Sequence, residues 1–288
     1  MIDVCDIQQM KPLLAAHGFH FSKAKGQNFL TAAWVPQRIT EDSGVNSSTG
    51  VLEIGPGIGS LTQCLCRKAG KVCAVELDSR LKPILKQTVG EFDNLEILWG
   101  DVLKQNIPEL VKQQFSGLRP AACANLPYYI TSQILTALLE AECFDTVTVM
   151  VQKEVAQRMA ARAGSGDYSA FTVFCRYYAE PEILFEVPAG CFLPQPKVTS
   201  AVITLKIRKK LPWDIRSKDV FFRTVRASFA MRRKKLQNGL ASGFPELGRE
   251  GAGEVIAECG FPENVRGETL DIAQFAALSN RIAEKIQK

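Results

Sequence analysis

The sequence has very few histidines and no cysteine pair of the kind that binds zinc. Its 288 residues contain only His17 and His20, both near the N-terminus and away from every other candidate motif. Because imidazole is the usual general base and a common metal ligand, we expect neither a histidine-dependent triad nor a histidine-based metal site. The nine cysteines are scattered and form no CxxC pair. We therefore expect reduced, mostly buried thiols and no bound metal.

Long apolar runs are also absent. No stretch reaches the roughly 18 apolar residues that a helix needs to cross a bilayer, and the N-terminus has no basic region followed by an apolar core, as a secretory signal would. The composition, 46% hydrophobic and 23% charged, is typical of globular proteins. We expect a monomeric cytoplasmic protein without a membrane partner, built of one sizeable domain and a smaller one.

Positive charge is concentrated in one segment. Between Lys206 and Lys235 there are twelve lysines and arginines and two aspartates, a local net charge of +10 in a chain whose net charge is +5. The remaining residues are therefore mildly acidic as a group. An ordinary solvated helix face would balance its bases with acids, so this excess predicts a surface that binds a polyanion, with nucleic acid favoured over an anionic membrane.

Apolar patterns predict strands that alternate with helices up to about residue 207, and this alternation indicates a parallel sheet. The expected strands are 51–55, 71–77, 95–99, 121–124, 146–152, 182–187 and 201–207. The expected helices are 6–17, 60–69, 79–89, 132–140, 153–161 and 170–179, with a flexible loop at 163–169. Beyond Arg208 the sequence predicts one long helix over 220–240 and no strand. We place a domain boundary there, between residues 1–208 and 209–288.

A glycine loop, Gly55-Pro56-Gly57-Ile58-Gly59, joins the first of these strands to a helix. A dinucleotide-binding loop has glycines at its first, third and sixth positions, whereas Ser60 stands at the sixth position here, which disfavours an NAD enzyme. Glu53 would repel phosphates and suits a ligand with a positive group.

Two further acids follow the next two strands. At the strand ends, Glu76 is placed to accept ribose hydroxyls and Asp101 to accept from an adenine amine. With Glu53, this set describes S-adenosylmethionine better than NAD, although each acid alone could be an ordinary surface carboxylate.

The turn Asn125-Leu126-Pro127-Tyr128, followed by Tyr129, ends a buried strand. Pro127 has a fixed φ and stiffens the turn. The turn can hold an amide oxygen, a backbone carbonyl and an aromatic face around one point, as a pocket for a flat base with an exocyclic amine requires. On this stretch alone, an ordinary strand-to-helix turn with half-buried tyrosines is an equally good interpretation.

Seven segments together resemble those of the KsgA (RsmA) family of small-subunit ribosomal RNA adenine dimethyltransferases. They are GQNFL (26–30), VLEIGPGIGSLT (51–62), AVELD (74–78), GD (100–101), NLPYYI (125–130), VQKEVAQRM (151–159) and FLPQPKVTSAV (192–202). The resemblance implies a Rossmann-like, S-adenosylmethionine-dependent methyltransferase fold with a mainly parallel sheet, plus a small C-terminal all-helical domain that binds RNA. Lys25, Ala163 and Ser169 depart from the family pattern, which leaves the RNA contacts of the 164–169 loop open.

The resemblance also implies site residues. The catalytic set is Asn125, Leu126, Pro127, Tyr128 and Phe192. The cofactor set is Gln27, Asn28, Leu30, Glu53, Gly55, Gly57, Glu76, Leu77, Asp101, Val102 and Asn125. The RNA-binding set is Arg223, Arg226, Arg232, Arg233, Lys234 and Lys235. In the expected mechanism the Asn125 side chain and the Leu126 carbonyl accept the two N6 hydrogens of an adenine, Tyr128 stacks on the base, and Phe192 approaches its other face.

The implied substrate is a pair of adjacent adenosines in the 3′-terminal hairpin loop of 16S rRNA within the immature 30S particle, each dimethylated at N6. Three alternatives stay open at this point. One is an Erm-type large-subunit rRNA methyltransferase, which shares several of these motifs. The others are a non-catalytic RNA-binding assembly factor on the same fold, and methylation of another amine such as a glutamine side chain or DNA adenine.

Overall fold

The computed structural model describes residues 2–22 and 26–286, so Lys25 lies outside the described residues. The chain forms two compact units. The first contains Met1–Ala156 and Glu180–Ile207, and the second contains Gln157–Ala179 and Arg208–Lys288. The chain enters the second unit for the last time at Arg208, close to the start of the basic segment. Residues 157–179, which we expected in the larger domain, belong instead to the second unit.

The first unit is built on a seven-stranded sheet with a separate two-stranded ribbon. The order within the sheet is β4-β3-β2-β5-β6-β9-β7, and the ribbon pairs β1 with β8. The strands are β1 (Phe29–Leu30), β2 (Thr49–Ile54), β3 (Lys71–Glu76), β4 (Leu95–Trp99), β5 (Arg119–Asn125), β6 (Thr146–Gln152), β7 (Ala179–Val187), β8 (Phe192–Leu193) and β9 (Ser200–Ile207). Strands β4 to β6 pair in parallel, and β9 is antiparallel to β6. The expected mainly parallel sheet is confirmed.

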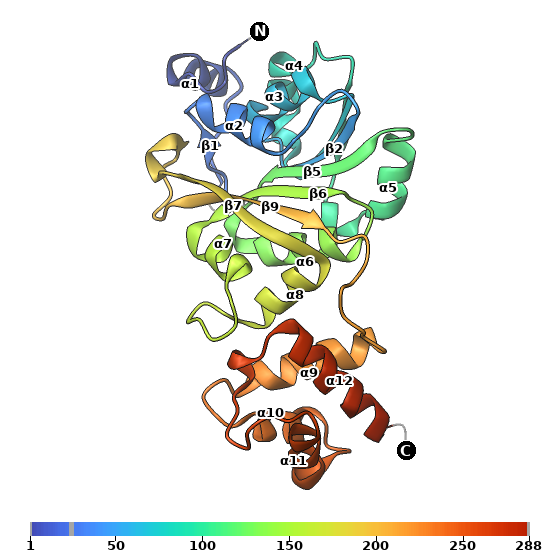
Figure 1. The fold of residues 1–288 in the computed structure, drawn as a ribbon. Helices are drawn as coiled ribbons and strands as arrows, with labels where there is room; N and C mark the ends of the chain where they lie inside the picture. The colour runs from blue at the N-terminus through green and yellow to red at the C-terminus, as the bar shows by residue number, and fades with distance from the viewer. Residues whose placement is uncertain (1, 23–25, 287–288) are drawn as a thin grey trace. The chain divides into compact units, whose positions relative to one another are not determined.

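Helices cover both sides of the sheet. Figure 1 shows α1 to α4 on one side of the central strands and α6 on the other. The helices of the chain are α1 (Ile7–Ala16), α2 (Trp34–Asp42), α3 (Ser60–Lys68), α4 (Lys82–Thr88), α5 (Ile107–Gln114), α6 (Thr131–Glu140), α7 (Lys153–Ala160), α8 (Ala170–Tyr178), α9 (Lys218–Ala230), α10 (Leu236–Gly243), α11 (Gly248–Glu258) and α12 (Ile272–Ile286). Within the described residues, none of them is both long and apolar enough to span a membrane.

Local sequence explains the first helix well. Asp6 caps α1 by accepting a hydrogen bond from the Gln8 backbone, and the helix buries Met10, Leu13 and Leu14. These side chains join a core cluster with α4, whereas a second cluster packs α2 and α3 on the sheet. Two apolar layers therefore hold the carboxyl ends of β2 and β3 in place.

The register brings the strand ends to one edge. Ile54 at the end of β2 pairs with Val75 of β3 on one side and Ala124 of β5 on the other. The glycine loop, Glu76 and Asn125 therefore leave the sheet at the same level. In open α/β sheets this carboxyl edge, where the strand order reverses, is where ligands bind.

The second unit is helical and has an aromatic core. Phe221, Phe244 and Phe275 are fully buried in it. The Tyr168 hydroxyl donates to the Leu270 carbonyl at 2.8 Å, and the Gly164 backbone donates to the Glu268 carbonyl at 2.8 Å. These bonds tie down the loop at 163–169, which we had expected to be flexible.

The structure differs from the sequence expectations in three further places. The single helix expected over 220–240 is two helices, because α9 ends at Ala230 and α10 begins at Leu236. At the break, the Leu236 backbone N–H donates a hydrogen bond to the Val265 carbonyl at 2.8 Å. No local sequence pattern predicts this bond, because the two residues are far apart in the chain. Helices α2 and α5 were not expected, although Asn106 caps α5, and Phe29–Leu30 is a strand within a segment expected to be irregular.

Candidate active site

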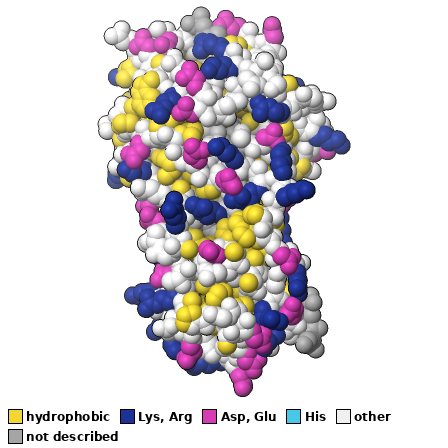
Figure 2. All heavy atoms as spheres, in the orientation of Figure 1, with side chains coloured by type: hydrophobic (Ala, Val, Ile, Leu, Met, Phe, Trp, Pro, Cys, Tyr) yellow, Lys and Arg dark blue, Asp and Glu magenta, His cyan; other side chains and the backbone are white. Residues whose placement is uncertain are grey.

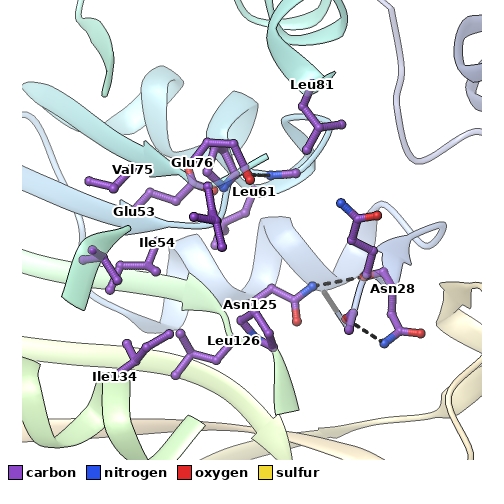
Figure 3. Close-up of a pocket in the computed structure, with 18 of the residues that line it drawn as sticks. Asn28, Glu53, Ile54, Leu61, Val75, Glu76, Leu81, Asn125, Leu126 and Ile134 are labelled. Carbon is purple, nitrogen blue, oxygen red and sulfur yellow. Dashed lines mark hydrogen bonds between the residues drawn. The ribbon is translucent and has the colours of Figure 1, made fainter. Parts of the chain in front are cut away.

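A cavity opens at the carboxyl edge of the sheet in the first unit. It is lined by residues 26–30, the glycine loop, the end of β3, residues 100–102 and the turn after β5, and its empty space is about 1050 Å³ counted out to the open mouth. Figure 3 shows Glu53, Glu76 and Asn125 around this space, each from a different strand. Asp101 lines the same space, so the three acids expected at consecutive strand ends, Glu53, Glu76 and Asp101, line one cavity.

The glycine loop depends on glycine at specific positions. Gly57 has a φ of 61°, and a Cβ there would lie 3.2 Å from the Phe29 ring. Gly59 has a φ of 95°, and a Cβ would lie 2.7 Å from Val89. A side chain is thus disfavoured by both backbone strain and contact, and the loop stays thin where it lines the cavity.

The Glu76 carboxylate ties the loop to β3. Its Oε2 accepts from the Gly57 backbone N–H at 3.2 Å, and its Oε1 accepts from the Asp78 N–H at 2.7 Å. Each carboxylate oxygen can accept more than one hydrogen bond, so Glu76 retains capacity for a ligand hydroxyl. Asp101 accepts from the Leu103 N–H at 3.0 Å through Oδ1, and within the described residues nothing donates to its Oδ2.

Glu53 is the most deeply buried acid of the site, with 1% of its surface exposed. No hydrogen-bond partner contacts its Oε2 among the described residues. Burial raises the pKa of Glu53 from 4.5 to about 8; the nearby Glu76 charge adds to this shift and the Thr62 hydroxyl opposes it. Glu53 is therefore mostly protonated at neutral pH, and a positive group bound beside its free Oε2 would favour the ionised carboxylate.

The Asn125 amide is oriented by a single backbone acceptor. Its Nδ2 donates to the Asn28 carbonyl oxygen at 3.3 Å, while the Asn28 side chain donates to the Gly26 carbonyl at 3.2 Å (Figure 3). A flipped amide would set two oxygens against each other, so Oδ1 is the atom left for a ligand. Among the described residues, none donates a hydrogen bond to Oδ1 or to the Leu126 carbonyl.

The rest of the turn is held by the backbone. The Leu126 N–H donates to the Met150 carbonyl at 3.1 Å, and the Pro127 carbonyl accepts from the Thr131 hydroxyl at 3.0 Å. The next residues form a 3₁₀ turn, Tyr128–Ile130. The turn is therefore rigid, as Pro127 predicts.

The two tyrosines of the turn have different environments, although both line the cavity. Tyr128 is partly buried, and its hydroxyl is 2.6 Å from the Ser200 Oγ. Tyr129 is 55% exposed, and its ring lies against Gly26, where a Cβ would be 3.2 Å away. Sequence reasoning included Ser200 only as part of the FLPQPKVTSAV segment, because a partner 72 residues away has no local signal.

The expected approach of Phe192 to the second face of the base stays a prediction, and the structure places this residue in the core. Its ring is 4% exposed and packs in the core cluster with Leu30, and it is not among the residues that line the cavity. The reason is the ribbon register, since Leu30 of β1 pairs directly with Phe192 of β8. In this structure Phe192 anchors the ribbon.

Leu30 and Gln27 line the cavity, but the Gln27 amide has a structural partner on each side. Its Oε1 accepts from the Ser22 backbone at 2.9 Å, and its Nε2 donates to Asp78 at 2.9 Å. Gln27 therefore supports the Glu76–Asp78 corner of the wall.

The six expected RNA-binding residues, all in the second unit, fall into two groups. Arg223, Arg232 and Lys235 hold acidic partners, namely Glu246, Glu268 and Glu263. Arg232 also donates to the Gly166 carbonyl at 2.7 Å and so holds the 163–169 loop. Arg226, Arg233 and Lys234 have no such partner among the described residues. On the face in Figure 2, acidic side chains lie among the basic ones, in keeping with this pairing.

The cavity fits S-adenosylmethionine. The side chains of Glu76 and Asp101 can accept from ribose and adenine, Glu53 can face a positive group, and Leu77, 51% exposed, offers apolar surface beside Val102. No lysine or arginine is present among the described lining residues, so nothing there would compensate a pyrophosphate. This donor set suits a cofactor without phosphates.

Comparison with known proteins agrees with this geometry. The family model described as ribosomal RNA adenine dimethylase matches residues 18–284. The curated relatives include the ribosomal RNA small subunit methyltransferases A of Geobacillus thermodenitrificans, 43% identical over 97% of both chains, and of Clostridioides difficile, 43% identical over 96% of both.

Two solved structures extend the comparison. The 23S rRNA methyltransferase ErmE is 27% identical, with a TM-score of 0.66 over 89% of this chain and 100% of that one. A dimethyladenosine transferase from Plasmodium falciparum has a TM-score of 0.76 at 24% identity, over 89% of this chain and 98% of that one, and this likeness shows the fold.

The fold and the site define a Rossmann-like methyltransferase whose cofactor is S-adenosylmethionine. Within that class, the chain belongs to the ribosomal RNA adenine dimethylase family.

Proposed function

We propose that this protein dimethylates the N6 atoms of two adjacent adenosines in the 3′-terminal hairpin loop of 16S rRNA, within an immature 30S particle. The observation that carries the proposal is the orientation of Asn125, whose Nδ2 is held by the Asn28 carbonyl so that Oδ1 stays available. When bound, S-adenosylmethionine would supply an electrophilic methyl group on its sulfonium, and the neutral thioether would be the leaving group.

Asn125 and Leu126 of the turn would activate the nucleophile, the N6 amine of adenine. The N6 lone pair of adenine is delocalised into the ring, and acceptors for the two N6 hydrogens would localise it on nitrogen. Asn125 Oδ1 and the Leu126 carbonyl are two such acceptors on a rigid turn. Alignment and hydrogen bonding replace a strong general base, in line with a set of described lining residues that contains no histidine.

The base is held by aromatic stacking. Tyr128 keeps one ring at the cavity with its hydroxyl fixed on Ser200, and we assign it the stacking face. Stacking contributes roughly 1–3 kcal/mol per base, enough to hold an adenine that is already unstacked in an RNA loop. The other face of the base is open to Tyr129, which lines the same cavity.

RNA is gripped through phosphates by the unpaired cations of the second unit. Arg226, Arg233 and Lys234 are the members of the basic segment whose charge is not offset by an acid in the described residues. Such contacts position RNA without reading its sequence and weaken as salt rises. We propose that the protein acts as a monomer on the assembling subunit in the cytoplasm.

The small subunit is favoured over the large one by the relatives. Relatives named for the small subunit are 41–44% identical, whereas ErmE, named for 23S rRNA, is 27% identical. A non-catalytic assembly role alone is disfavoured, because the turn and the cofactor acids are intact and share one cavity.

Labelled S-adenosylmethionine, offered with unmethylated small subunits and separately with large subunits, tests the proposal. Mass spectrometry of nuclease fragments should find N6,N6-dimethyladenosine at two neighbouring positions near the 3′ end of 16S rRNA. Dimethyladenosine confined to large-subunit RNA would overturn it.

A further inference from the structure

A buried serine outside the cavity lining contacts the proposed stacking residue. The Ser200 Oγ is 2.6 Å from the Tyr128 hydroxyl, and Ser200 has no exposed surface. We propose that Ser200 is a positioning residue for methyl transfer, because it fixes the depth and tilt of the Tyr128 ring in the base pocket. This inference rests on the proposed function, since it assigns a role within the same site.

The backbone bonds of the turn fix only the start of the Tyr128 side chain. Tyr128 follows Pro127, whose carbonyl accepts from the Ile130 N–H at 3.3 Å, so the main chain is fixed at the start of the side chain. The ring borders a large open cavity and could rotate into it. A hydrogen bond at the hydroxyl fixes the far end of the side chain as well, which restricts the directions in which the ring can point.

Ser200 itself is rigidly placed. It is the first residue of β9, and its Cα is in register with Gln152 at the end of β6. The preceding residue, Thr199, accepts a hydrogen bond from the Lys153 backbone at 3.0 Å. The Ser200 hydroxyl is therefore held by the sheet, and its hydrogen bond holds the Tyr128 ring relative to the sheet.

The state of the phenol agrees with this role. Burial raises the pKa of Tyr128, and the bond to Ser200 opposes only part of that shift, so the phenol keeps its proton at neutral pH. Both groups are then neutral hydroxyls, each able to donate or accept. The segment at 192–200 thus acts on the pocket through Ser200, whereas Phe192 is part of the core.

The test is a double-mutant cycle on full-length protein with small subunits as substrate. Ser200→Ala and Tyr128→Phe each remove the same hydrogen bond, and Tyr128→Phe keeps the ring. We expect each to lower kcat on the order of tenfold, with the S-adenosylmethionine Kd unchanged, because a small displacement of a positioning group slows transfer without affecting cofactor contacts. The double variant should be no slower than either single one.

Thr204→Val is the matched control. It removes another buried hydroxyl pair between β6 and β9, Thr148 to Thr204 at 3.0 Å, away from the cavity. We expect this variant to keep the wild-type kcat, whatever its effect on Tm. A normal kcat in Ser200→Ala, or effects of the two single variants that multiply, would overturn the inference.

Tyr128→Phe keeps the test open if Ser200→Ala does not fold, since a wild-type kcat in that variant also overturns the positioning role. If the wild-type protein leaves small-subunit adenosines unmethylated, the proposed function fails instead, and the two failures are therefore distinguishable.

Discussion

The Asn125 Nδ2 donates to the Asn28 carbonyl oxygen at 3.3 Å, joining the turn after β5 to the segment that carries β1. The two residues are 97 positions apart in the chain. This bond selects the amide oxygen as the group that faces a substrate, and it also places the 26–30 segment against the reactive end of the cavity. The orientation of the Asn125 amide thus depends on the 26–30 segment, although no residue of that segment is assigned a contact with the N6 amine.

The buried Glu53 carboxyl predicts a pH dependence of cofactor affinity. With its pKa near 8, Glu53 is mostly protonated at neutral pH. A positively charged cofactor favours the ionised form, so the Kd for S-adenosylmethionine should fall as the pH rises from 6 to about 8 and then level off. Isothermal titration at several pH values measures this. In Glu53→Gln the dependence should vanish, and a wild-type Kd that does not change with pH would contradict the assignment.

The same group predicts the sign of a stability change. Its folded-state pKa of about 8 lies above the ordinary 4.5, so the folded protein holds a proton that the unfolded chain releases between these values. This contribution to the free energy of unfolding is fully present below pH 4.5 and is lost as the pH rises through about 8. Urea unfolding of the cofactor-free protein at pH 6 and pH 8 should show a larger decrease in wild type than in Glu53→Gln. Equal decreases would show that Glu53 does not titrate in this range.

The glycine loop predicts a selective loss of cofactor binding. Gly57→Ala puts a Cβ at positive φ and 3.2 Å from the Phe29 ring, where the cavity wall must then shift. Gly117 has a φ of 77° with nothing within 4 Å of its Cβ position, so Gly117→Ala reports backbone strain alone. Both variants should lose about 1 kcal/mol of stability. Only Gly57→Ala should bind S-adenosylmethionine more weakly, by roughly tenfold or more, and equal affinities would refute the role of the loop.

The division of the basic segment predicts different effects for two adjacent lysines. Lys234 has no acidic partner among the described residues, whereas Lys235 is 2.7 Å from Glu263. Lys234→Gln should reduce the slope of log affinity against log salt by about 0.7–0.9, as expected for one lost phosphate contact. Lys235→Gln should reduce it less. Filter binding to a 16S hairpin RNA at several salt concentrations measures the slopes, and a larger effect at Lys235 would invalidate this division.

Local sequence patterns predicted much of the fold, because each parallel strand is an apolar run and three of the strands have an acidic residue at or near the carboxyl end. Glu53, Glu76 and Asp101 were expected at one edge, and the register places them there. Features that depend on contacts between distant segments had no such signal. The pairing of Leu30 with Phe192 puts the Phe192 ring in the core, and the bonds made by Arg232 and Leu236 break a helix that periodicity alone would continue.

The central claim is tested most directly by methyl transfer in Asn125→Ala. The substitution removes both the amide oxygen and the bond to Asn28, while Glu76, Asp101 and the glycine loop remain. We predict that single-turnover transfer to small-subunit adenosines becomes undetectable while the Kd for S-adenosylmethionine stays within about threefold of wild type, because Asn125 is only one of the cofactor residues whereas its oxygen is one of the two acceptors for the amine. Transfer at close to the wild-type rate would contradict the account.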